Sequence, residues 1–151
     1  MFKTDDGRVF DVYKDSVHDD LFMVAAKKCD YFVASPALGF EGEEVTSEGK
    51  KWTLAPLSHA NADKMRKAYP FTAPSRILGR DKTMGVGDRL GIATDGHLRV
   101  FKEYKEITPV LSQQSIRELN LTNRTFADVI DSASFAVFRC GYTTGWGADG
   151  D

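Results

Sequence analysis

The stretch TFADVIDSASFAVFRCG, residues 125–141, decides the fold that the sequence predicts. Thr125 and Asp128 have the spacing of a capping box at the start of a helix, and Gly141 lies where a left-handed residue would end it. Between them, apolar residues repeat at helical spacing: Phe126, Val129, Ile130, Ala133, Ala136, Val137 and Cys140. We therefore expect a helix that packs its apolar face against a sheet.

Three short segments around this helix are typical of the strands of that sheet. They are DRLGIAT (88–94), ITPVL (107–111) and GWGAD (145–149). The segment HLRVFKEY (97–104) predicts a helix, with Thr94 or Asp95 capping its first turn. Pro109 indicates an edge strand or a strand end, because proline has no N–H to donate. The order strand, helix, strand, helix, strand predicts parallel β/α units.

The first part of the chain has the pattern of a small sheet made of short strands. The segments RVFDVY (8–13), LFMVAA (21–26) and YFVAS (31–35) are the expected strands, and GFEGEEVTSEGKK (39–51) predicts a hairpin or an exposed loop. HANADKMRKAY (59–69) predicts a helix that the following prolines end. We predict a small α+β region over residues 1–82 and the start of a β/α domain over residues 83–151.

The composition excludes several function classes. Among 151 residues, 20 basic and 22 acidic side chains leave a net charge of −2, so nothing indicates binding to nucleic acid or to an anionic membrane. No segment approaches the roughly 20 apolar residues of a membrane-spanning helix, and no secretory signal is visible. Cys29 and Cys140 stand apart without metal-binding spacing, which is typical of reduced thiols in a cytoplasmic protein. Small metabolites are therefore the expected ligands.

Polar side chains gather where the three predicted strands end, and in parallel β/α folds these ends share one rim. The residues are His97 after the first strand, Gln113, Gln114 and Arg117 after the second, and Asp149 and Asp151 after the third. Amides suit hydroxyl groups, an arginine suits a carboxylate, and an aspartate can transfer protons or bind metal. This set therefore suits a polyhydroxylated anionic ligand, although each residue alone is also compatible with an ordinary loop or surface role.

The glycine-rich segment GVGDRLG (85–91) invites comparison with dinucleotide-binding loops. Its glycines follow G-x-G-x-x-x-G instead of G-x-G-x-x-G, and it precedes a predicted strand, whereas that fingerprint follows a strand and opens a helix. We therefore do not expect nucleotide binding. Asp88 and Arg89 are expected to form an ion pair or the wall of a pocket, in which Arg89 would contact substrate.

Several blocks quoted above, in this order and spacing, resemble the amino-terminal portion of the tagaturonate epimerase family. They are GVGDRLGIAT, PVLSQQSIREL and NRTFADVIDSASFAVFRCGYTTGWGADGD. The similarity is clear over residues 85–151 and weaker before them. Family members continue G-A-D-x-D-H into a (β/α)8 barrel roughly three times as long as this chain. The resemblance therefore implies the first three β/α units of a TIM-like barrel, truncated one residue before the family's histidine.

The resemblance implies a metal-dependent isomerase that interconverts D-tagaturonate and D-fructuronate in hexuronate catabolism. The two sugars differ at a carbon β to the ketone, so retro-aldol cleavage or metal-aided proton transfer are the routes left open. Asp151 would be the general base, Asp149 would contact the substrate or support the site, and Gln113, Gln114, Arg117, His97 and Arg89 would bind the substrate. The implied cofactor is a divalent cation that this chain alone would not fully coordinate, so we expect the chain alone to be inactive.

Two alternatives stay open at this point. One is a related ketose or sugar-acid isomerase, such as a tagatose 4-epimerase-like enzyme, and the other is a non-catalytic carbohydrate-binding or interaction module. Three barrel strands without their neighbours would also expose sheet edges, which favours association with another copy of the chain.

Overall fold

The computed structural model describes residues 1–149 of the chain. The chain divides into two compact units, Met1–Ala68 and Tyr69–Asp151. A compact unit is not in itself a domain, so the boundary predicted between residues 82 and 83 stays a prediction.

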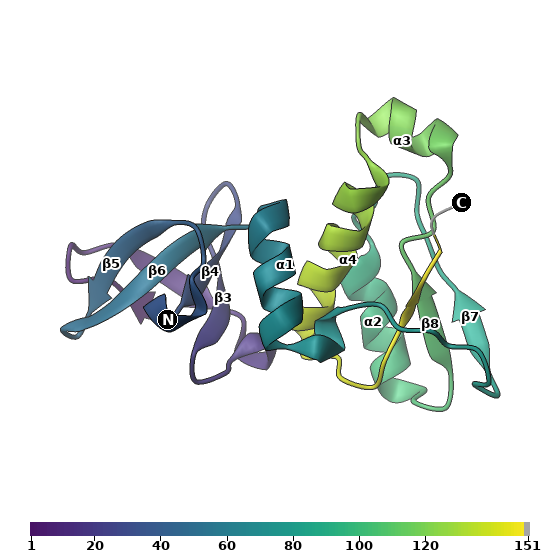
Figure 1. Ribbon diagram of the computed structural model, residues 1–151, viewed down its shortest axis with the longest axis horizontal. Coiled ribbons are helices and arrows are strands. Elements are labelled where there is room, and N and C mark those ends of the chain that lie inside the picture. Colours follow the sequence, from purple (N-terminus) through teal and green to yellow (C-terminus); the bar gives the residue numbers. More distant parts are fainter. Residues whose placement is uncertain (150–151) are drawn as a thin grey trace. The chain divides into compact units, whose positions relative to one another are not determined.

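The first unit is built on a six-stranded antiparallel sheet (Figure 1). In the order of the sheet, the strands are β1 (Phe2–Lys3), β2 (Val9–Val12), β3 (Leu21–Ala25), β4 (Asp30–Ala34), β6 (Lys50–Pro56) and β5 (Glu43–Ser47). The three strands predicted before residue 36 are confirmed as β2, β3 and β4. The hairpin alternative for residues 39–51 is also confirmed, because β5 and β6 pair around a turn in which Glu48 and Gly49 both have positive φ.

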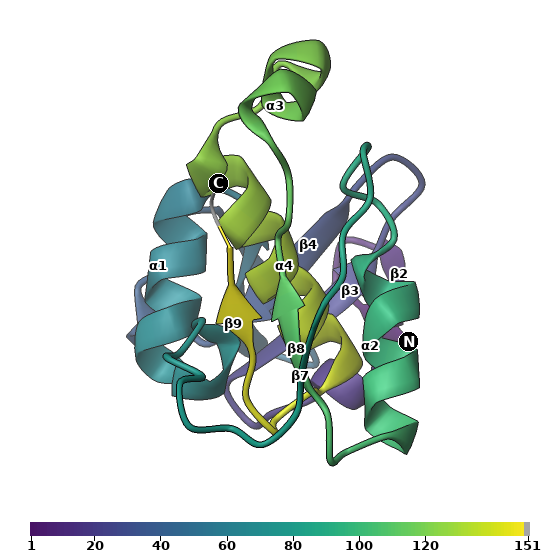
Figure 2. The same cartoon turned by 90° about the vertical axis from the view of Figure 1, so that its right-hand side faces the viewer.

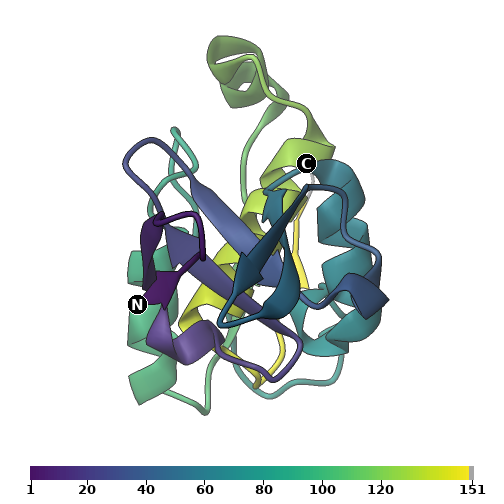
Figure 3. The same cartoon turned by 90° about the vertical axis from the view of Figure 1, so that its left-hand side faces the viewer.

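Hydrogen bonds between the two end strands nearly close this sheet. The Asp5 N–H donates to the Thr46 carbonyl at 2.8 Å, and the Ser47 hydroxyl donates to the Lys3 carbonyl at 2.6 Å. Apolar side chains from the strands form one cluster: Phe2, Phe10, Val24, Val33, Val45, Trp52 and Leu54. Figure 3 looks onto these strands, which are coloured purple to blue.

One α-helix and two 3-10 helices complete the first unit. The 3-10 helices are η1 (Lys14–Ser16) and η2 (Pro36–Leu38), and the predicted helix is confirmed as α1 (His59–Ala68). The buried Asn61 joins α1 to the sheet, since its amide nitrogen donates to the carbonyls of Glu41 and Pro56, both at 2.9 Å.

The second unit has a three-stranded parallel sheet in the order β7-β8-β9. Its elements along the chain are η3 (Pro70–Thr72), β7 (Thr83–Gly85), α2 (Thr94–Glu103), β8 (Thr108–Leu111), α3 (Ile116–Thr122), α4 (Phe126–Cys140) and β9 (Gly147–Ala148). The chain therefore has a mixed α/β fold, as predicted. Three parallel strands do not establish a (β/α)8 barrel, which we treat below as a proposal.

Helices α2 and α4 cover one face of this parallel sheet (Figure 2). Their shared core consists of Leu98, Phe101, Leu111, Ala133, Ala136, Val137, Tyr142 and Trp146. The capping box of Thr125 and Asp128 and the left-handed cap at Gly141 (φ 59°) are both confirmed. Phe126, in the first turn of α4, is the member of the predicted apolar stripe that stays exposed.

The predicted strand at residues 88–94 is wrong, since residues 88–93 belong to the loop between β7 and α2, and Thr94 begins α2. The Asp88 carboxylate folds the loop by accepting the N–H groups of Leu90, Ile92 and Ala93 at 3.0 to 3.1 Å. Ile92 is 79% exposed, so the apolar side chains of this segment do not form the buried face of a strand. The predicted cap of α2 is wrong as well, because Ala93 occupies the N-cap position without a side-chain hydrogen bond.

Pro109 lies in the central strand β8, so the predicted edge strand is wrong, but the predicted alternative of a strand end is confirmed, because Pro109 is the second residue of β8. The N–H of Thr108 and the carbonyl of Val110 both bond towards β7. Because bonding groups alternate sides along a strand, the nitrogen of Pro109 faces β9. The pairing with β9 begins only at Val110, opposite Gly147, so no ladder hydrogen bond is lost at Pro109.

Helix α3 was not predicted from the polar letters SQQSIRE. Ser115 accepts the Glu118 N–H, and the Glu118 carboxylate accepts the Ser115 N–H, which completes a capping box. The left-handed Asn123 (φ 52°) ends the helix.

Candidate functional site

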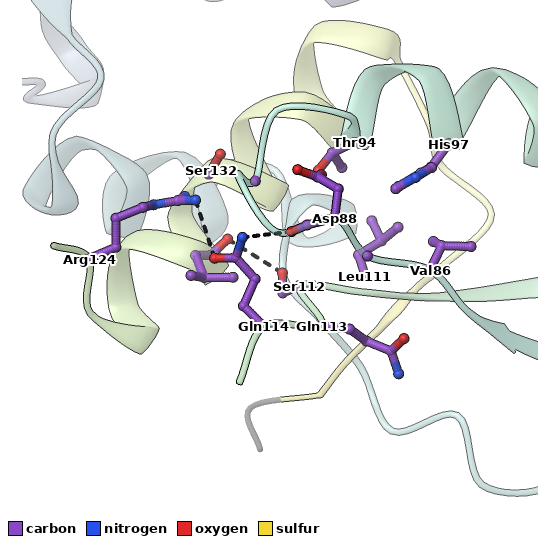
Figure 4. A pocket seen from close by; sticks show the side chains of 13 residues that line it. Val86, Asp88, Thr94, His97, Leu111, Ser112, Gln113, Gln114, Arg124 and Ser132 are labelled. Carbon is purple, nitrogen blue, oxygen red and sulfur yellow. Dashed lines mark hydrogen bonds between the residues drawn. The ribbon is translucent and has the colours of Figure 1, made fainter. Parts of the chain in front are cut away.

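A small cavity lies beside the carboxyl ends of β7 and β8 (Figure 4). Its volume is about 20 Å³, which is room for about one water molecule. The lining comes from the β7–α2 loop, the first turn of α2, the end of β8 and α4, and includes Asp88, Thr94, His97, Ser112, Gln114 and Ser132.

Asp88 holds the loop that forms one side of this cavity. Partial burial raises the pKa of its carboxyl group, but hydrogen bonds from the N–H groups of Ala93, Ile92 and Leu90 favour the charged form and outweigh burial. The net pKa of Asp88 is therefore below its ordinary value. Both carboxylate oxygens accept N–H groups from the backbone of this loop, which gives Asp88 a structural role in the site.

Gln114 joins the same loop to Arg124, which directly precedes the N-cap of α4. Its side chain is 4% exposed, its Nε2 donates to the Asp88 carbonyl at 2.8 Å, and its Oε1 accepts from Arg124 Nη1 at 3.3 Å. Arg124 also donates to the carbonyls of Leu90 and Asp128. Both ends of the Gln114 amide therefore already have protein partners. Its predicted contact with a substrate hydroxyl stays a prediction, and the geometry gives it a structural role.

Gln113 points to a different side of the chain from Gln114 (Figure 4). Its Nε2 donates to Asp149 Oδ2 at 3.3 Å. Gln113 follows β8 and Asp149 follows β9, so the pair spans the carboxyl ends of two adjacent parallel strands. The Asp149 backbone N–H also donates to the Leu111 carbonyl at 3.3 Å, which fixes the end of β9 beside β8.

The remaining predicted site residues lie in different parts of the structure. His97 is half-buried on α2 and lines the cavity. Arg89 and Arg117 lie elsewhere, around a second hollow of about 390 Å³ beside α3. The Arg89 side chain is 90% exposed, and its Nε is 3.8 Å from Glu118 Oε1. Asp151 lies outside the described residues.

The order of elements around residues 85–91 corrects one argument against nucleotide binding. The segment follows β7 and leads into α2, so the expectation that it precedes a strand was wrong. The glycine spacing still differs from the dinucleotide fingerprint. In addition, the Asp88 carboxylate accepts the Ala93 N–H at the start of α2, where its negative charge would repel a phosphate group.

A model of the tagaturonate epimerase family, UxaE, matches residues 2–151 of the chain. The chain belongs to the tagaturonate epimerase family. The resemblance of residues 85–151 is thereby confirmed, and the match to this family also includes the six-stranded sheet of the first unit.

Two kinds of relative support the assignment to the tagaturonate epimerase family. The tagaturonate/fructuronate epimerase of Thermotoga maritima is 34% identical to the whole chain, which covers 33% of that protein. Native and glycerol-complexed crystal structures of the fructuronate-tagaturonate epimerase UxaE from Cohnella laeviribosi are 42% identical, with a TM-score of 0.83. They match 94% of this chain and 30% of the solved one. The chain thus spans about a third of the length of these relatives.

No group of three or more His, Cys, Asp or Glu side chains within residues 1–149 could hold a metal ion. Within the same residues, no helix is long and apolar enough to cross a membrane. Both cysteines are free thiols, Cys29 exposed and Cys140 partly buried.

Sequence reasoning missed the role of Arg124 in this site. The residue lies ten positions from Gln114 and stands directly before a helix cap, where an arginine carries no recognisable signal. The role of Asp88 had a signal in the sequence. An aspartate at the start of a loop often accepts backbone N–H groups a few residues later and so closes a turn.

Proposed function

We propose that this chain supplies part of the substrate site of an epimerase that interconverts D-tagaturonate and D-fructuronate. The observation that carries the proposal is the Gln113–Asp149 pair, which joins the carboxyl ends of β8 and β9 beside the cavity in a chain of this family. Ligands of α/β folds bind at the carboxyl ends of parallel strands. The chain spans only about a third of the length of these relatives. The hexuronate substrate is therefore inferred from the names of the relatives.

The chemistry of the pair suits a polyhydroxylated ligand. The Asp149 carboxylate is exposed and keeps acceptor positions for sugar hydroxyls, and the Gln113 amide keeps an acceptor oxygen and a second N–H. The adjoining cavity holds about one water-sized group, so it would admit at most one hydroxyl of a hexuronate. The substrate would therefore lie mainly over the carboxyl ends of β8 and β9, against Gln113 and Asp149.

We also propose that β7, β8 and β9 are the first strands of a (β/α)8 barrel. Their parallel order supports this, together with the placement of α2 and α4 on one face of the sheet. The structure of the product of the whole reading frame tests it. A sheet that ends at three parallel strands would contradict the proposal.

A divalent metal stays a prediction, and so does the role of Asp151 as general base. Residues 1–149 contain no cluster of three or more His, Cys, Asp or Glu side chains that could hold a metal ion, and we derive no chemical step through one. The part of the reaction that we assign to described residues is the binding and orientation of hydroxyl groups by Gln113 and Asp149.

The direct test is an epimerisation assay on the protein encoded by the whole reading frame. The assay follows tagaturonate and fructuronate by NMR. We expect Asp149→Asn to lower kcat/KM by about 100-fold or more if the carboxylate takes part in proton transfer, and by about tenfold if it only binds a hydroxyl. Asp81→Asn, which changes an exposed carboxylate in the same unit, should leave kcat/KM unchanged. A wild-type protein that does not interconvert the two sugars would contradict the proposed function.

One observation favours a second candidate, an epimerase of neutral ketoses. The two arginines predicted to bind a substrate carboxylate, Arg89 and Arg117, lie around the second hollow instead of the cavity, and Arg124 is already bonded to three oxygen acceptors. Comparing tagatose with the uronates separates the candidates. If Arg117 binds the uronate carboxylate, Arg117→Glu will lower kcat/KM for uronates and spare neutral ketoses. An unchanged uronate rate in Arg117→Glu would remove Arg117 from the site.

A further inference from the structure

The Gln113 side chain lies directly over Gly85, the last residue of β7. A Cβ atom added at Gly85 would be 2.5 Å from Gln113 Nε2, 2.6 Å from Oε1 and 2.8 Å from Cδ. The optimal separation between packed carbon atoms is about 3.5–4.0 Å, and Cβ contacts below 3.0 Å are essentially never seen, so any side chain at position 85 would displace the carboxamide. Only a glycine therefore leaves the amide where it is.

Gly87 leaves room for the same residue in a different way. A Cβ atom at Gly87 would overlap the Gln113 carbonyl oxygen, and would be 2.9 Å from Gln113 Cβ. Neither glycine has a positive φ, so backbone conformation does not require glycine at either position. Both positions need glycine because a Cβ atom would not fit. Gly85 lies against the flexible end of the Gln113 side chain, and Gly87 lies against the Gln113 main chain.

The position of the Gln113 amide matters because of its partner. The amide nitrogen donates to Asp149 Oδ2 at 3.3 Å, so the chain of contacts runs from Gly85 through Gln113 to Asp149. Gly85 belongs to β7, Gln113 follows β8 and Asp149 follows β9, so the contacts connect all three parallel strands. A displaced carboxamide would leave the exposed Asp149 carboxylate free to adopt other rotamers.

We propose that Gly85 is a positioning residue, which keeps the Gln113 carboxamide in place to hold the Asp149 carboxylate in the orientation that receives substrate hydroxyls. The statement that this orientation serves substrate binding rests on the proposed function. The contact of Gly85, Gln113 and Asp149 can be tested without it.

The decisive variant is Gly85→Ala. The three heavy atoms nearest to its methyl group belong to the end of a flexible side chain, so the fold should persist and the melting temperature should stay close to that of the wild type. Loss of one hydrogen bond to a carboxylate corresponds to a drop of about tenfold in kcat/KM. Gly96→Ala is the matched control, because a Cβ atom at Gly96 has nothing within 4 Å and its φ is not positive.

A double-mutant cycle separates positioning from general structural damage. Gln113→Ala removes the carboxamide, so Gly85→Ala should add no further loss in that background. An equal loss of kcat/KM in both backgrounds would overturn the proposal, because the effect of the methyl group would then not pass through Gln113. Unchanged kcat/KM in Gly85→Ala with Gln113 present would overturn it as well.

A second measurement does not depend on activity. The side-chain amide resonances of Gln113 in ¹H–¹⁵N spectra report the contact with Asp149. We expect Gly85→Ala and Asp149→Asn to shift these resonances, and Gly96→Ala to leave them in place. If the wild-type protein encoded by the whole reading frame does not interconvert the two sugars but the resonances respond in this way, the proposed function fails and the positioning contact stands. If Gly85→Ala leaves the resonances unchanged, the positioning contact fails whatever the activity.

Discussion

The Arg124 guanidinium occupies the space that a side chain at Gly91 would need. Arg124 Nη1 would overlap a Cβ atom at Gly91, and it donates to the Leu90 carbonyl at 3.4 Å and to Gln114 Oε1 at 3.3 Å. Gly91 also has a φ of +69°, which disfavours residues with a Cβ atom. Two independent causes, conformation and space, therefore require glycine at this position of the β7–α2 loop.

We predict that Gly91→Ala lowers the free energy of unfolding by about 1–3 kcal/mol, since the left-handed conformation alone costs an alanine about 1–2 kcal/mol. Urea denaturation of the 151-residue chain measures the effect. Gly96→Ala serves as the control, and within α2 it should leave the stability unchanged or raise it by up to about 1 kcal/mol. Equal stability of the two variants would contradict this account of the loop.

We predict that the stabilising effect of Asp88 depends on pH. The pKa of its carboxyl group is lower in the folded protein than its ordinary value of 3.8. The charged form therefore contributes stability above pH 3.8, and this contribution is lost as the pH falls through the folded-state pKa. The difference in unfolding free energy between the wild type and Asp88→Asn should be largest above about pH 5 and shrink below about pH 4.

Denaturation curves of both proteins at a series of pH values give this difference, and the other carboxyl groups cancel in it. A difference that stays constant between about pH 3 and pH 6 would show that the charge of Asp88 does not hold the loop.

The sequence was most informative where a few neighbouring residues decide the structure. The cap residues Thr125 and Asp128 and the glycine at 141 are local signals, and α4 begins and ends where they predict. The same signal, Ser115 followed by Glu118, is present for α3, but it lies in a polar segment that has no apolar stripe to indicate a helix. These elements were accessible because caps act over three or four residues.

Prediction failed where a side chain or a neighbouring strand decides the structure. Residues 88–94 have strand-like apolar letters, but the carboxylate of Asp88 turns the backbone and leaves Ile92 exposed. The tolerance of Pro109 in a central strand depends on where β9 begins to pair, which lies far along the chain. Gln113 Nε2 and Asp149 Oδ2, which were expected on one rim, lie 3.3 Å apart. The burial of Gln114 against Arg124 had no local signal, and its predicted substrate contact stays a prediction.

We predict that Thr125→Ala lowers the free energy of unfolding by about 0.5–2 kcal/mol, because the first turn of α4 loses its cap. Thr125→Ser keeps the hydroxyl and should retain most of the stability. Thermal denaturation compares the two variants. If they are equally destabilised, the methyl group of Thr125 and not its hydrogen bond to Asp128 supports the helix.

We predict that Leu98→Ala costs about 2–5 kcal/mol, because Leu98 is fully buried in the core between α2, α4 and the parallel sheet. Val100→Ala, on the same helix, changes a side chain that is 52% exposed and should cost less than about 1 kcal/mol. Urea denaturation of both variants tests the assignment. Similar losses would mean that α2 does not present Leu98 to the core.

The bonds that nearly close the first sheet give the first residues of the chain a protective role. The Asp5 N–H and the Ser47 hydroxyl connect the β1 end of the chain to β5, and the Asp5 carboxylate accepts the N–H groups of Glu48 and Gly49 in the turn after β5. Shorter versions of the protein that begin after residue 6 would leave unpaired backbone groups along β2 and β5. Exposed strand edges of this kind can pair with other chains, so we expect a protein without residues 1–6 to aggregate more readily.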